Sequence, residues 1–307
     1  MSTIPATFRS ARRSCAARKR GREVAREARY ARLRRIIELT RRIATAPGRL
    51  YSLAELSAAT GAARSTLSED ITLIDDVLQE KGLGVVETVT GAAGGVRYRV
   101  GFSPQQAEDL AQALAVELSD TERIIPGGFL YMTDVIFSPH WSDRIGALFA
   151  GRFQAQAPDM VLTMETKGIP LALMTARSLG VPLAVARRES RVTEGPAISL
   201  NYVSSSGRIG TMSLPRRALP AGSRVLVVDD FLKGGSTVRG LVDLCQELGA
   251  ACVGIASLCE TPSEDKYLPA PQFSVLRLAA VDEHLRRVQL GPSDSFQLYL
   301  EEARHHA

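Results

Sequence analysis

Long apolar runs are absent from this sequence. No stretch approaches the ~20 consecutive apolar residues that a helix needs to cross a bilayer, and the N-terminus lacks the apolar core of a signal peptide. These absences argue against a membrane-spanning or secreted protein, so we expect a cytoplasmic protein with no membrane partner. Hydrophobic residues nevertheless make up 45% of the 307 positions, which is enough for about two domains, each with its own core.

Cysteine is also scarce. The four cysteines are Cys15, Cys245, Cys252 and Cys259. They show no C-x-x-C spacing, and three of them lie in apolar helix or strand patterns. We therefore expect buried thiols without a disulfide framework, and we expect no dedicated metal site.

Acidic residues are nearly missing from the first part of the chain. Residues 1–42 contain fourteen Arg and Lys against three Glu, whereas the rest of the chain has 24 Arg and Lys against 30 acidic residues. The excess positive charge therefore lies at one end. Such a distribution is typical of an electrostatic contact with nucleic acid.

Residues 1–28 form a basic, Ala-rich arm in which apolar residues show no period, so we expect no regular structure in the free protein. Two interpretations remain open. In one, the arm tracks DNA phosphates and adds affinity without sequence information. In the other, translation begins later, for instance at Val24, and the arm does not belong to the protein.

Residues 29–101 have the pattern of a winged-helix domain. Apolar residues recur at helical spacing over residues 30–43, 53–56 and 67–78. Three helices with a tight turn before the third indicate a helix-turn-helix, whose third helix presents its first residues to the major groove. The residues expected to contact DNA are Arg64, Ser65, Thr66 and Ser68, with Arg34 and Arg35 on the first helix. For Ser65, an equally good interpretation is that it only caps the helix.

A β-hairpin follows the third helix. Its strands cover residues 85–89 and 96–100, around a glycine-rich turn at residues 91–95. Arg97 lies on the face opposite Val96 and Tyr98, where it can reach the DNA backbone or the minor groove. This hairpin is the expected wing.

Residues 102–122 are expected to form a helix that connects two domains. Ser103, Pro104 and Gln106 supply the N-cap, N1 and N3 chemistry of a helix start. The apolar stripe from Ala107 to Leu118 could equally form a dimer contact.

Residues 123–307 alternate strands and helices, which predicts an α/β domain. Within it, residues 224–237, RVLVVDDFLKGGST, read as a strand, a loop and a helix. Asp229 and Asp230 at the strand end can accept hydrogen bonds from sugar hydroxyls. Backbone N–H groups of Gly234, Gly235, Ser236 and Thr237 lie at a helix start, where the dipole favours a phosphate. A phosphorylated pentose would satisfy both halves.

Two other interpretations of this segment are weaker. The acidic pocket of a response-regulator receiver also follows such a strand, but it needs a further Asp at a strand end roughly forty residues on. The candidate strand at residues 273–278 ends without one. The segment could otherwise be a core strand that ends in a solvated acidic turn.

A second strand-loop-helix unit supports the phosphate interpretation. The strand Met160–Met164 leads into Thr166, Lys167 and Gly168, and then into a helix at about residues 170–179. Lys167 and Arg187, each at a strand end, can neutralise a pyrophosphate, although Arg187 and Arg188 could also be solvated charges. Residues 197–203 and 209–213 predict a hairpin that covers the site as a flap.

The acid pair and the small-residue loop resemble the 5-phosphoribosyl-1-pyrophosphate (PRPP) loop of type I phosphoribosyltransferases. Together with the winged helix, the chain is similar over about residues 30–260 to the purine operon repressor family of Gram-positive bacteria. The stretches that carry the resemblance are STLSEDITLI, TGAAGGVRY, PGGFLYMTD, TKGIPLA, VTEG, NYVSSSGRI and VVDDFLKGGST.

The resemblance implies a fold, a function and a set of site residues. The fold is an N-terminal winged helix followed by a type I phosphoribosyltransferase-like α/β domain with a mainly parallel sheet. The function is a homodimeric DNA-binding repressor of purine synthesis genes, with PRPP as its effector and no enzymatic activity. The resemblance implies that Asp229 and Asp230 contact the ribose of PRPP and that residues 234–237, Gly234, Gly235, Ser236 and Thr237, contact its 5-phosphate. It implies that the pyrophosphate is bound by Thr166, Lys167, Gly168 and Arg187. The residues expected around these contacts are Phe129, Tyr131, Phe231 and Lys233.

Departures from the family pattern leave an alternative open. The phosphate loop reads K-G-G-S-T where the family has K-A-G-G-T, which should keep the N–H donors. Some enzymes of this fold place an Asp general base where Lys233 stands, and an ammonium group cannot accept a proton. Because other relatives take the base elsewhere, the alternative is an active purine phosphoribosyltransferase with an attached DNA-binding domain. No cofactor is required, and a Mg²⁺ ion could bridge the pyrophosphate.

Overall fold

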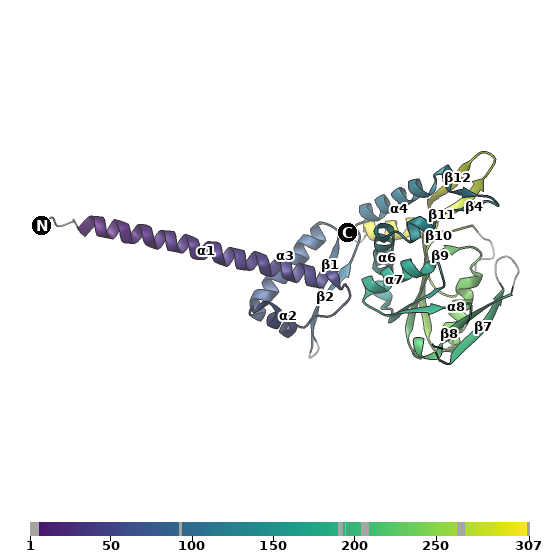
Figure 1. Cartoon of the computed structure of the whole chain (residues 1–307), viewed down its shortest axis with the longest axis horizontal. Helices are drawn as coiled ribbons and strands as arrows, with labels where there is room; N and C mark the ends of the chain where they lie inside the picture. The colour runs from purple at the N-terminus through teal and green to yellow at the C-terminus, as the bar shows by residue number, and fades with distance from the viewer. Residues whose placement is uncertain are drawn as a thin grey trace.

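The computed structural model describes residues 6–91, 94–189, 193, 195–203, 209–262 and 268–305, with side chains of the first helix given at Glu23 and from Arg26 onward. Its elements form two units that lie side by side, and helix α1 projects away from both (Figure 1). Over these residues, no helix is both long enough and apolar enough to span a membrane.

The N-terminal unit is a winged helix. Its elements are α1 (Ala6–Thr45), α2 (Leu53–Thr60), α3 (Arg64–Glu80), β1 (Gly84–Val89) and β2 (Gly95–Val100). The strands β1 and β2 pair antiparallel. Its core contains Leu39, Ile43, Tyr51, Leu56, Leu67, Ile71, Ile74, Val86, Val96 and Tyr98. The three helices and the hairpin predicted for this domain are therefore confirmed.

Helix α1 differs from the sequence-based prediction in two ways. It begins at Ala6, so the expectation of irregular structure was wrong for residues 6–28. Ala and Arg favour helix even without tertiary packing. In addition, the apolar residues at helical spacing over residues 30–43 do not all face the core, because Tyr30, Leu33 and Ile37 are exposed while Leu39 and Ile43 are buried. The apolar residues of α1 cover more of its circumference than the rest of the winged helix can bury.

Helix α4 (Pro104–Leu118) has the predicted start, with a complete capping box between Ser103 and Gln106. Its apolar stripe, from Ala107 to Leu118, is fully buried in the core of the C-terminal unit. Helix α4 is thus part of that domain as well as the connection to it. The alternative that this stripe forms a dimer contact was wrong, since the same chain already covers it.

The C-terminal unit is built on a six-stranded sheet with the order β12-β11-β10-β9-β5-β6. Its strands are β5 (Met160–Met164), β6 (Leu183–Ala186), β9 (Arg224–Leu232), β10 (Ala251–Glu260), β11 (Gln272–Asp282) and β12 (Arg287–Pro292). All neighbours pair parallel except β11 with β12. The predicted mainly parallel α/β domain is confirmed.

Both faces of this sheet are covered. The helices are α5 (Thr133–Ile136), α6 (Pro139–Phe153), α7 (Gly168–Leu179), α8 (Ser236–Glu247) and α9 (Asp294–His305). One core joins α4, α6, α7 and α9 to one face, and a second core joins α8 and the hairpin of β7 (Ala197–Val203) and β8 (Ile209–Pro215) to the other. Alternate residues of β9 face the two cores, which explains why residues 225–228 form one apolar run.

The backbones of the two units approach closely at two glycines, Gly48 and Gly180. Gly48, in the turn after α1, has a φ of +74°, and a Cβ atom there would lie 2.1 Å from the carbonyl oxygen of Leu179 at the end of α7. At Gly180 a Cβ atom would lie 2.7 Å from the carbonyl carbon of Gly48. The C-terminal end of α7 therefore abuts the winged helix at a contact that side chains would prevent.

The cysteines of the α/β domain behave as predicted. Cys245 and Cys259 are buried and Cys252 is half-buried, and none of the three is disulfide-bonded. Burial raises the pKa of the Cys245 thiol to about 12, so this thiol is protonated and unreactive at neutral pH. The side chain of Cys15 lies outside the part of the chain that the structure describes.

Candidate functional site

The acid pair ends the central strand β9. Asp229 is only 7% exposed, and one of its carboxylate oxygens accepts a hydrogen bond of 2.9 Å from the backbone N–H of Asp230. Burial, and then the neighbouring charge of Asp230, raise the pKa of the Asp229 carboxyl well above its usual range. The strand therefore presents one carboxyl group held in a buried site and one, on Asp230, that is more accessible.

The glycine loop that follows is shaped for close approach to a ligand. Gly234 and Gly235 have φ values of +67° and +74°, in the left-handed region that favours glycine. Helix α8 begins directly after them at Ser236, with no side chain that caps its first N–H groups. The first turn of a helix leaves its N–H groups without intrahelical partners, so these donors are available for an anion.

A second loop, between β5 and α7, faces the first. Thr166 and Lys167 are exposed, whereas Gly168 is buried. A Cβ atom on Gly168 would lie 2.4 Å from the Thr163 hydroxyl oxygen and 3.2 Å from a carboxylate oxygen of Asp229. Only glycine lets this loop pass so close to the acid pair, which brings the two predicted loops together.

Two neighbouring cavities open where these loops meet. The hairpin cavity, of about 240 Å³, lies beside the short hairpin of β3 (Ile124–Ile125) and β4 (Phe129–Leu130). The strand-end cavity, of about 260 Å³, lies over the ends of β5 and β9. They share the lining residues Lys167, Asp230 and Phe231. Asp230 thus stands between two compartments, one with aromatic and apolar walls and one with charged walls.

Most of the predicted ligand-binding residues gather around these cavities. Thr166, Asp229 and Thr237 line the strand-end cavity, and Phe129 and Lys233 line the hairpin cavity. The Lys233 ammonium lies over the Phe129 ring, 5.9 Å from its centroid, and closes one side of the hairpin cavity. Gly168, Gly234, Gly235 and Ser236 belong to the surrounding loops.

Two predicted residues have a different environment. Tyr131 is 44% exposed and lines neither of the two cavities. Tyr131 follows the last paired residue of β4, a strand of only two residues. Arg187 lies at the end of β6, where its guanidinium group forms an ion pair with Glu165 at 3.3 Å.

Sequence reasoning missed Glu165, Tyr202 and Thr261. Glu165 and Tyr202 line the strand-end cavity, and Thr261 lines the hairpin cavity. Glu165 immediately precedes the predicted loop, so its position at a strand end was an available signal. Tyr202 is brought in by the β7–β8 hairpin from a distant part of the chain. The Ser/Gly turn predicted for this hairpin lies outside the described residues.

No metal cage is evident in the described ranges, where no group of three or more His, Cys, Asp or Glu side chains converges on a point. The site offers two adjacent carboxyl groups, Asp229 and Asp230, beside an open cavity. Such a pair suits a hydrated cation that arrives with a phosphate ligand better than a tightly held resident ion.

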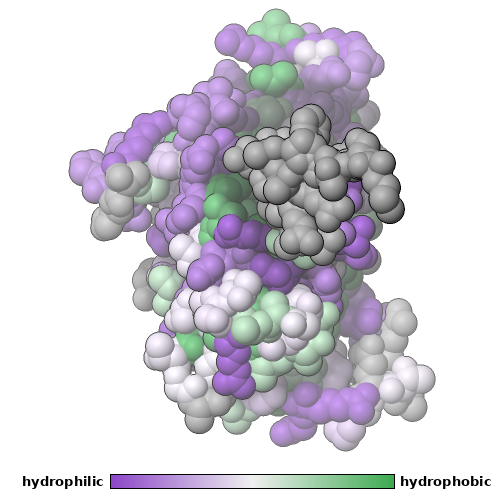
Figure 2. Space-filling model, turned by 90° about the vertical axis from the view of Figure 1, so that its left-hand side faces the viewer, coloured by the Kyte–Doolittle hydropathy of each residue, from purple (hydrophilic) through white to green (hydrophobic). Residues whose placement is uncertain are grey.

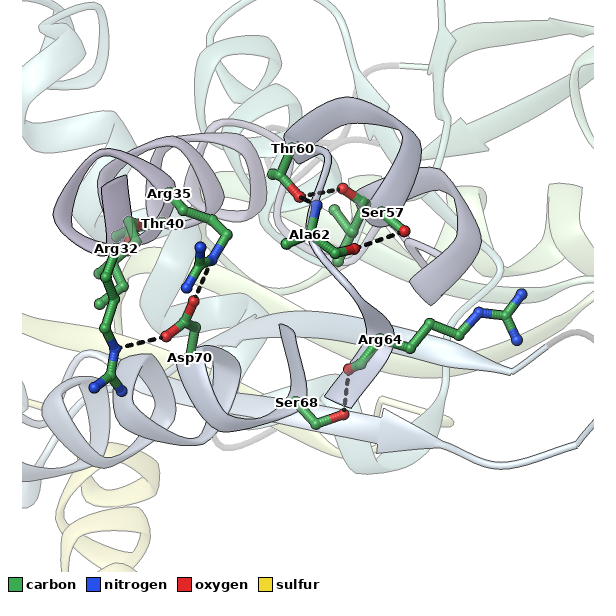
Figure 3. Close-up of polar contacts among 11 residues, drawn as sticks. Arg32, Arg35, Thr40, Ser57, Thr60, Ala62, Arg64, Ser68 and Asp70 are labelled. Carbon is green, nitrogen blue, oxygen red and sulfur yellow. Dashed lines mark hydrogen bonds and ion pairs between the residues drawn. The ribbon is translucent and has the colours of Figure 1, made fainter. Parts of the chain in front are cut away.

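The nucleic-acid face of the winged helix is built around the start of α3. Arg64 and Ser68 are exposed, and the Ser68 hydroxyl donates a hydrogen bond of 3.1 Å to the Arg64 carbonyl oxygen (Figure 3). The N-cap residue of α3 is Ala63, which makes no side-chain cap. The interpretation of Ser65 as a helix cap was therefore wrong, and its exposed hydroxyl remains available to DNA.

A groove of about 510 Å³ separates α3 from the wing. Arg64, Ser68 and Thr72 line it from α3, and Thr88 and Thr90 line it from the wing side. Seen along α1, hydrophilic surface lies beside the grey atoms, and an area of intermediate to weakly hydrophobic surface, drawn white and pale green, lies below them (Figure 2). A groove that carries Arg64 and several hydroxyl groups beside a helix N-terminus is suited to a DNA backbone, although Leu53, Ile71 and Val89 also line it.

The cations of the wing are held by one acid. Arg97 and Arg99 contact the same carboxylate oxygen of Glu87 across the hairpin, at 3.0 and 2.6 Å. The hydrogen bond from Arg99 is the largest influence that lowers the pKa of the Glu87 carboxyl. The charge of Arg97, which was predicted to contact DNA, is therefore partly neutralised by Glu87.

The two arginines predicted on α1 differ in role. Arg34 is exposed and remains a candidate for DNA contact. Arg35 donates a hydrogen bond of 2.5 Å to Asp70 of α3, and Arg32 donates another of 3.0 Å to the second oxygen of the same carboxylate (Figure 3). Because Asp70 is 1% exposed, Arg35 primarily fastens α1 to α3.

Two known families match this chain. The family described as "Bacterial purine repressor, N-terminal" matches residues 31–100, and the "Phosphoribosyl transferase domain" matches residues 135–282. The two matches coincide with the winged helix and with most of the α/β unit.

Curated proteins are similar over most of the chain. The purine biosynthesis transcriptional repressor PurR of Bacillus subtilis is 40% identical over 257 residues, which cover 83% of this chain and 90% of that protein. The purine biosynthesis transcriptional activator PurR of Lactococcus lactis is 36% identical, over 84% of this chain and 96% of its own length.

Two phosphoribosyltransferases match about half of this chain. A xanthine phosphoribosyltransferase of Geobacillus thermodenitrificans is 37% identical over 147 residues, which cover 47% of this chain and 76% of that protein. A solved structure of adenine phosphoribosyltransferase from Thermoanaerobacter pseudethanolicus is 20% identical, covers 54% of this chain and 98% of its own, and has a TM-score of 0.47.

Proposed function

The chain belongs to the PurR family of purine biosynthesis transcriptional regulators, and from this premise we propose that it represses purine synthesis genes and senses PRPP. It binds operator DNA through the winged helix as a homodimer. Its α/β domain holds PRPP without catalysing transfer, and bound PRPP lowers the affinity for DNA.

One observation carries the ligand assignment. Asp230 stands between a charged cavity and an aromatic one, directly beside a helix N-terminus that is free of side-chain caps. A ribose that bears a phosphate at one end and a diphosphate at the other matches this arrangement. Its hydroxyls meet the acid pair, its 5-phosphate meets the first N–H groups of α8, and its diphosphate meets the loop at Lys167.

The same geometry supports binding without transfer. A purine base that attacks the ribose must lose a proton, and Lys233 lines the hairpin cavity, which we infer to be the compartment for such a base. An ammonium group is a donor and cannot act as the general base. The cation–π contact between Lys233 and Phe129 further occupies the wall of this cavity.

Helix α7 supports a physical link between the two sites. It begins at the loop that contains Lys167 and ends at Leu179, against Gly48 of the winged helix. A ligand that shifts the start of α7 would therefore move its end against the DNA-binding unit. By linkage, operator DNA must weaken PRPP binding by the same factor by which PRPP weakens DNA binding.

Calorimetry with PRPP tests the ligand assignment. We expect the wild-type protein to release heat with saturable binding, and we expect the Asp229→Asn, Asp230→Asn double variant to bind at least about tenfold more weakly, because two charge-assisted hydrogen bonds to the ribose are removed. Equal binding heats and affinities for the two proteins would contradict the assignment of Asp229 and Asp230 to the PRPP site. Light scattering of the purified protein measures the proposed dimer.

The alternative is an active phosphoribosyltransferase, and the similarity to xanthine phosphoribosyltransferase favours it. Incubation with PRPP and each purine base in turn separates the two functions. The regulator should leave PRPP intact, whereas release of pyrophosphate with formation of a nucleotide would establish the enzyme.

A further inference from the structure

Glu165 is an acid at a place where an anionic ligand is expected. It follows the last residue of β5 and lines the strand-end cavity. One carboxylate oxygen accepts a hydrogen bond of 2.8 Å from the backbone N–H of Arg188, and the other lies 3.3 Å from the Arg187 guanidinium. The carboxylate thus engages a cation and an N–H donor at the end of β6.

These two partners are the kind of groups that bind phosphate. A guanidinium group and a backbone N–H at a strand end together match the oxygens of a diphosphate. Glu165 and Arg187 are both largely shielded from water, with side chains 22% and 27% exposed. Their ion pair is therefore less screened than an exposed surface pair, and a ligand must compete with it directly.

The residues that line the strand-end cavity include more acids than bases, although an anionic ligand is proposed there. Three acids, Glu165, Asp229 and Asp230, line the strand-end cavity against two bases, Lys167 and Arg188. Asp229 and Asp230 have an assigned partner in the ribose hydroxyls. Glu165 has no such role and opposes a diphosphate by charge.

We propose that Glu165 is an internal competitor of the diphosphate, a specificity-determining residue that holds Arg187 and the Arg188 N–H until the ligand displaces it. This inference rests on the proposed function. Displacement costs binding free energy only for ligands that carry a diphosphate. Glu165 therefore sets the PRPP concentration at which the sensor responds, and it leaves the affinity for a sugar monophosphate unchanged.

The test is calorimetry on the full-length Glu165→Gln variant with three probes: PRPP, inorganic pyrophosphate and ribose 5-phosphate. Glutamine keeps an acceptor for the Arg188 N–H and removes the charge. We expect PRPP and pyrophosphate to bind about tenfold more tightly than to wild type, as expected for removal of one nearby negative charge in a partly shielded site. Ribose 5-phosphate should bind as it does to wild type.

A matched control separates local from general charge effects. Asp143→Asn removes one negative charge from the exposed ion pair with Arg177, between α6 and α7 and outside the cavity, and it should change none of the three affinities. A Glu165→Ala variant with an unchanged melting temperature provides a second readout, and it should also tighten PRPP binding.

Two results would overturn the inference. Unchanged PRPP affinity in both Glu165 variants would show that no competition exists, and weaker binding would show that Glu165 positions Arg187 for the ligand. If the wild-type protein still binds PRPP, either result leaves the proposed function intact. Absence of PRPP binding to wild type and to both variants alike would instead overturn the proposed function and this inference with it.

Discussion

Asp229 faces two opposing demands. A carboxylate at the end of β9 is needed to accept hydrogen bonds from a sugar, yet its burial disfavours the charged form. Burial of this group costs stability, and under the proposed function ligand binding offsets that cost. The sequence identifies the acid pair from its position, but burial depends on Gly168, which the fold brings in from another loop.

Asp229→Asn should therefore stabilise the free protein while it weakens PRPP binding. The pKa of the Asp229 carboxyl is raised in the folded state, so the unfolded state loses its proton first as the pH rises above about 4. Ionisation of the Asp229 carboxyl then favours the unfolded state. The resulting loss in the free energy of unfolding reaches its full size above the raised pKa. We expect a gain of about 1 kcal/mol near neutral pH, or a few degrees in melting temperature.

Thermal melts across a pH series provide the check. The difference between variant and wild type should shrink as the pH falls, and it should level off below the ordinary carboxyl pKa of about 4, where both states of the wild-type carboxyl group are protonated. A constant difference at all pH values would refute the role of ionisation.

Asp70 is a buried acidic residue of the winged helix. Its buried carboxylate holds Arg32 and Arg35 of α1, and Asp70→Asn leaves these cations without an anionic partner. We expect a decrease of about 3 kcal/mol in the stability of the winged helix, with an unchanged affinity for PRPP. Chemical denaturation followed by circular dichroism measures the first effect.

The control is Glu38→Gln, which removes an exposed ion pair with Arg42 on the same helix. Exposed pairs contribute at most about 0.5 kcal/mol, so this variant should melt like wild type. Equal destabilisation of both variants would contradict the assigned role of Asp70.

At the scale of whole elements, local signals in the chain predicted most of what the structure contains. The wing, the capped start of α4 and the loop before α8 follow from glycines, N-cap residues and alternation, all of which act within a few residues. The exposed face of α1 was not predictable, because Tyr30, Leu33 and Ile37 have the spacing of a buried stripe. Glu165 and Tyr202 line one cavity because the β7–β8 hairpin packs with α8 against one face of the sheet.

Helix α7 is the element through which the sites should communicate, and Gly48 tests it. Gly48→Ala places a Cβ atom 2.1 Å from the Leu179 carbonyl oxygen, so the two units must separate. We expect PRPP binding to persist, while the ratio of operator affinities without and with PRPP falls by about threefold or more. Fluorescence anisotropy of labelled operator DNA measures this ratio.

Gly61→Ala is the matched control. Gly61 has a similar φ of +69° but nothing within 4 Å of the added Cβ atom. Both variants carry the same strain of a left-handed Ala, roughly 1 kcal/mol, and only Gly48→Ala disturbs the contact with α7. A response to PRPP that is equal in the two variants would show that coupling does not pass through this contact.

For the whole molecule, the main electrostatic feature is its unequal distribution of charge. The first 22 residues contain seven Arg and Lys and no acidic residue. From Ala6 onward they belong to helix α1, which projects from the winged helix (Figure 1). A cationic rod of this kind is suited to DNA phosphates.

Deletion of residues 1–22 should weaken operator binding about tenfold at low salt and leave PRPP affinity unchanged. The plot of log affinity against log salt should become shallower by about 0.9 for each DNA phosphate that the arm no longer neutralises. Operator binding at several salt concentrations, compared with the full-length chain, tests whether the basic arm contacts DNA phosphates. Identical salt slopes would show that the arm does not contact DNA.

The central claim is that one chain couples a sugar-phosphate site to a DNA reader, and operator affinity with and without PRPP measures it most directly. Titration of labelled DNA from a purine synthesis operator should show at least about fivefold weaker binding at saturating PRPP, and Asp230→Asn should abolish the difference. Equal operator affinity with and without PRPP, in a wild-type protein that calorimetry shows to be saturated with PRPP, would contradict the account.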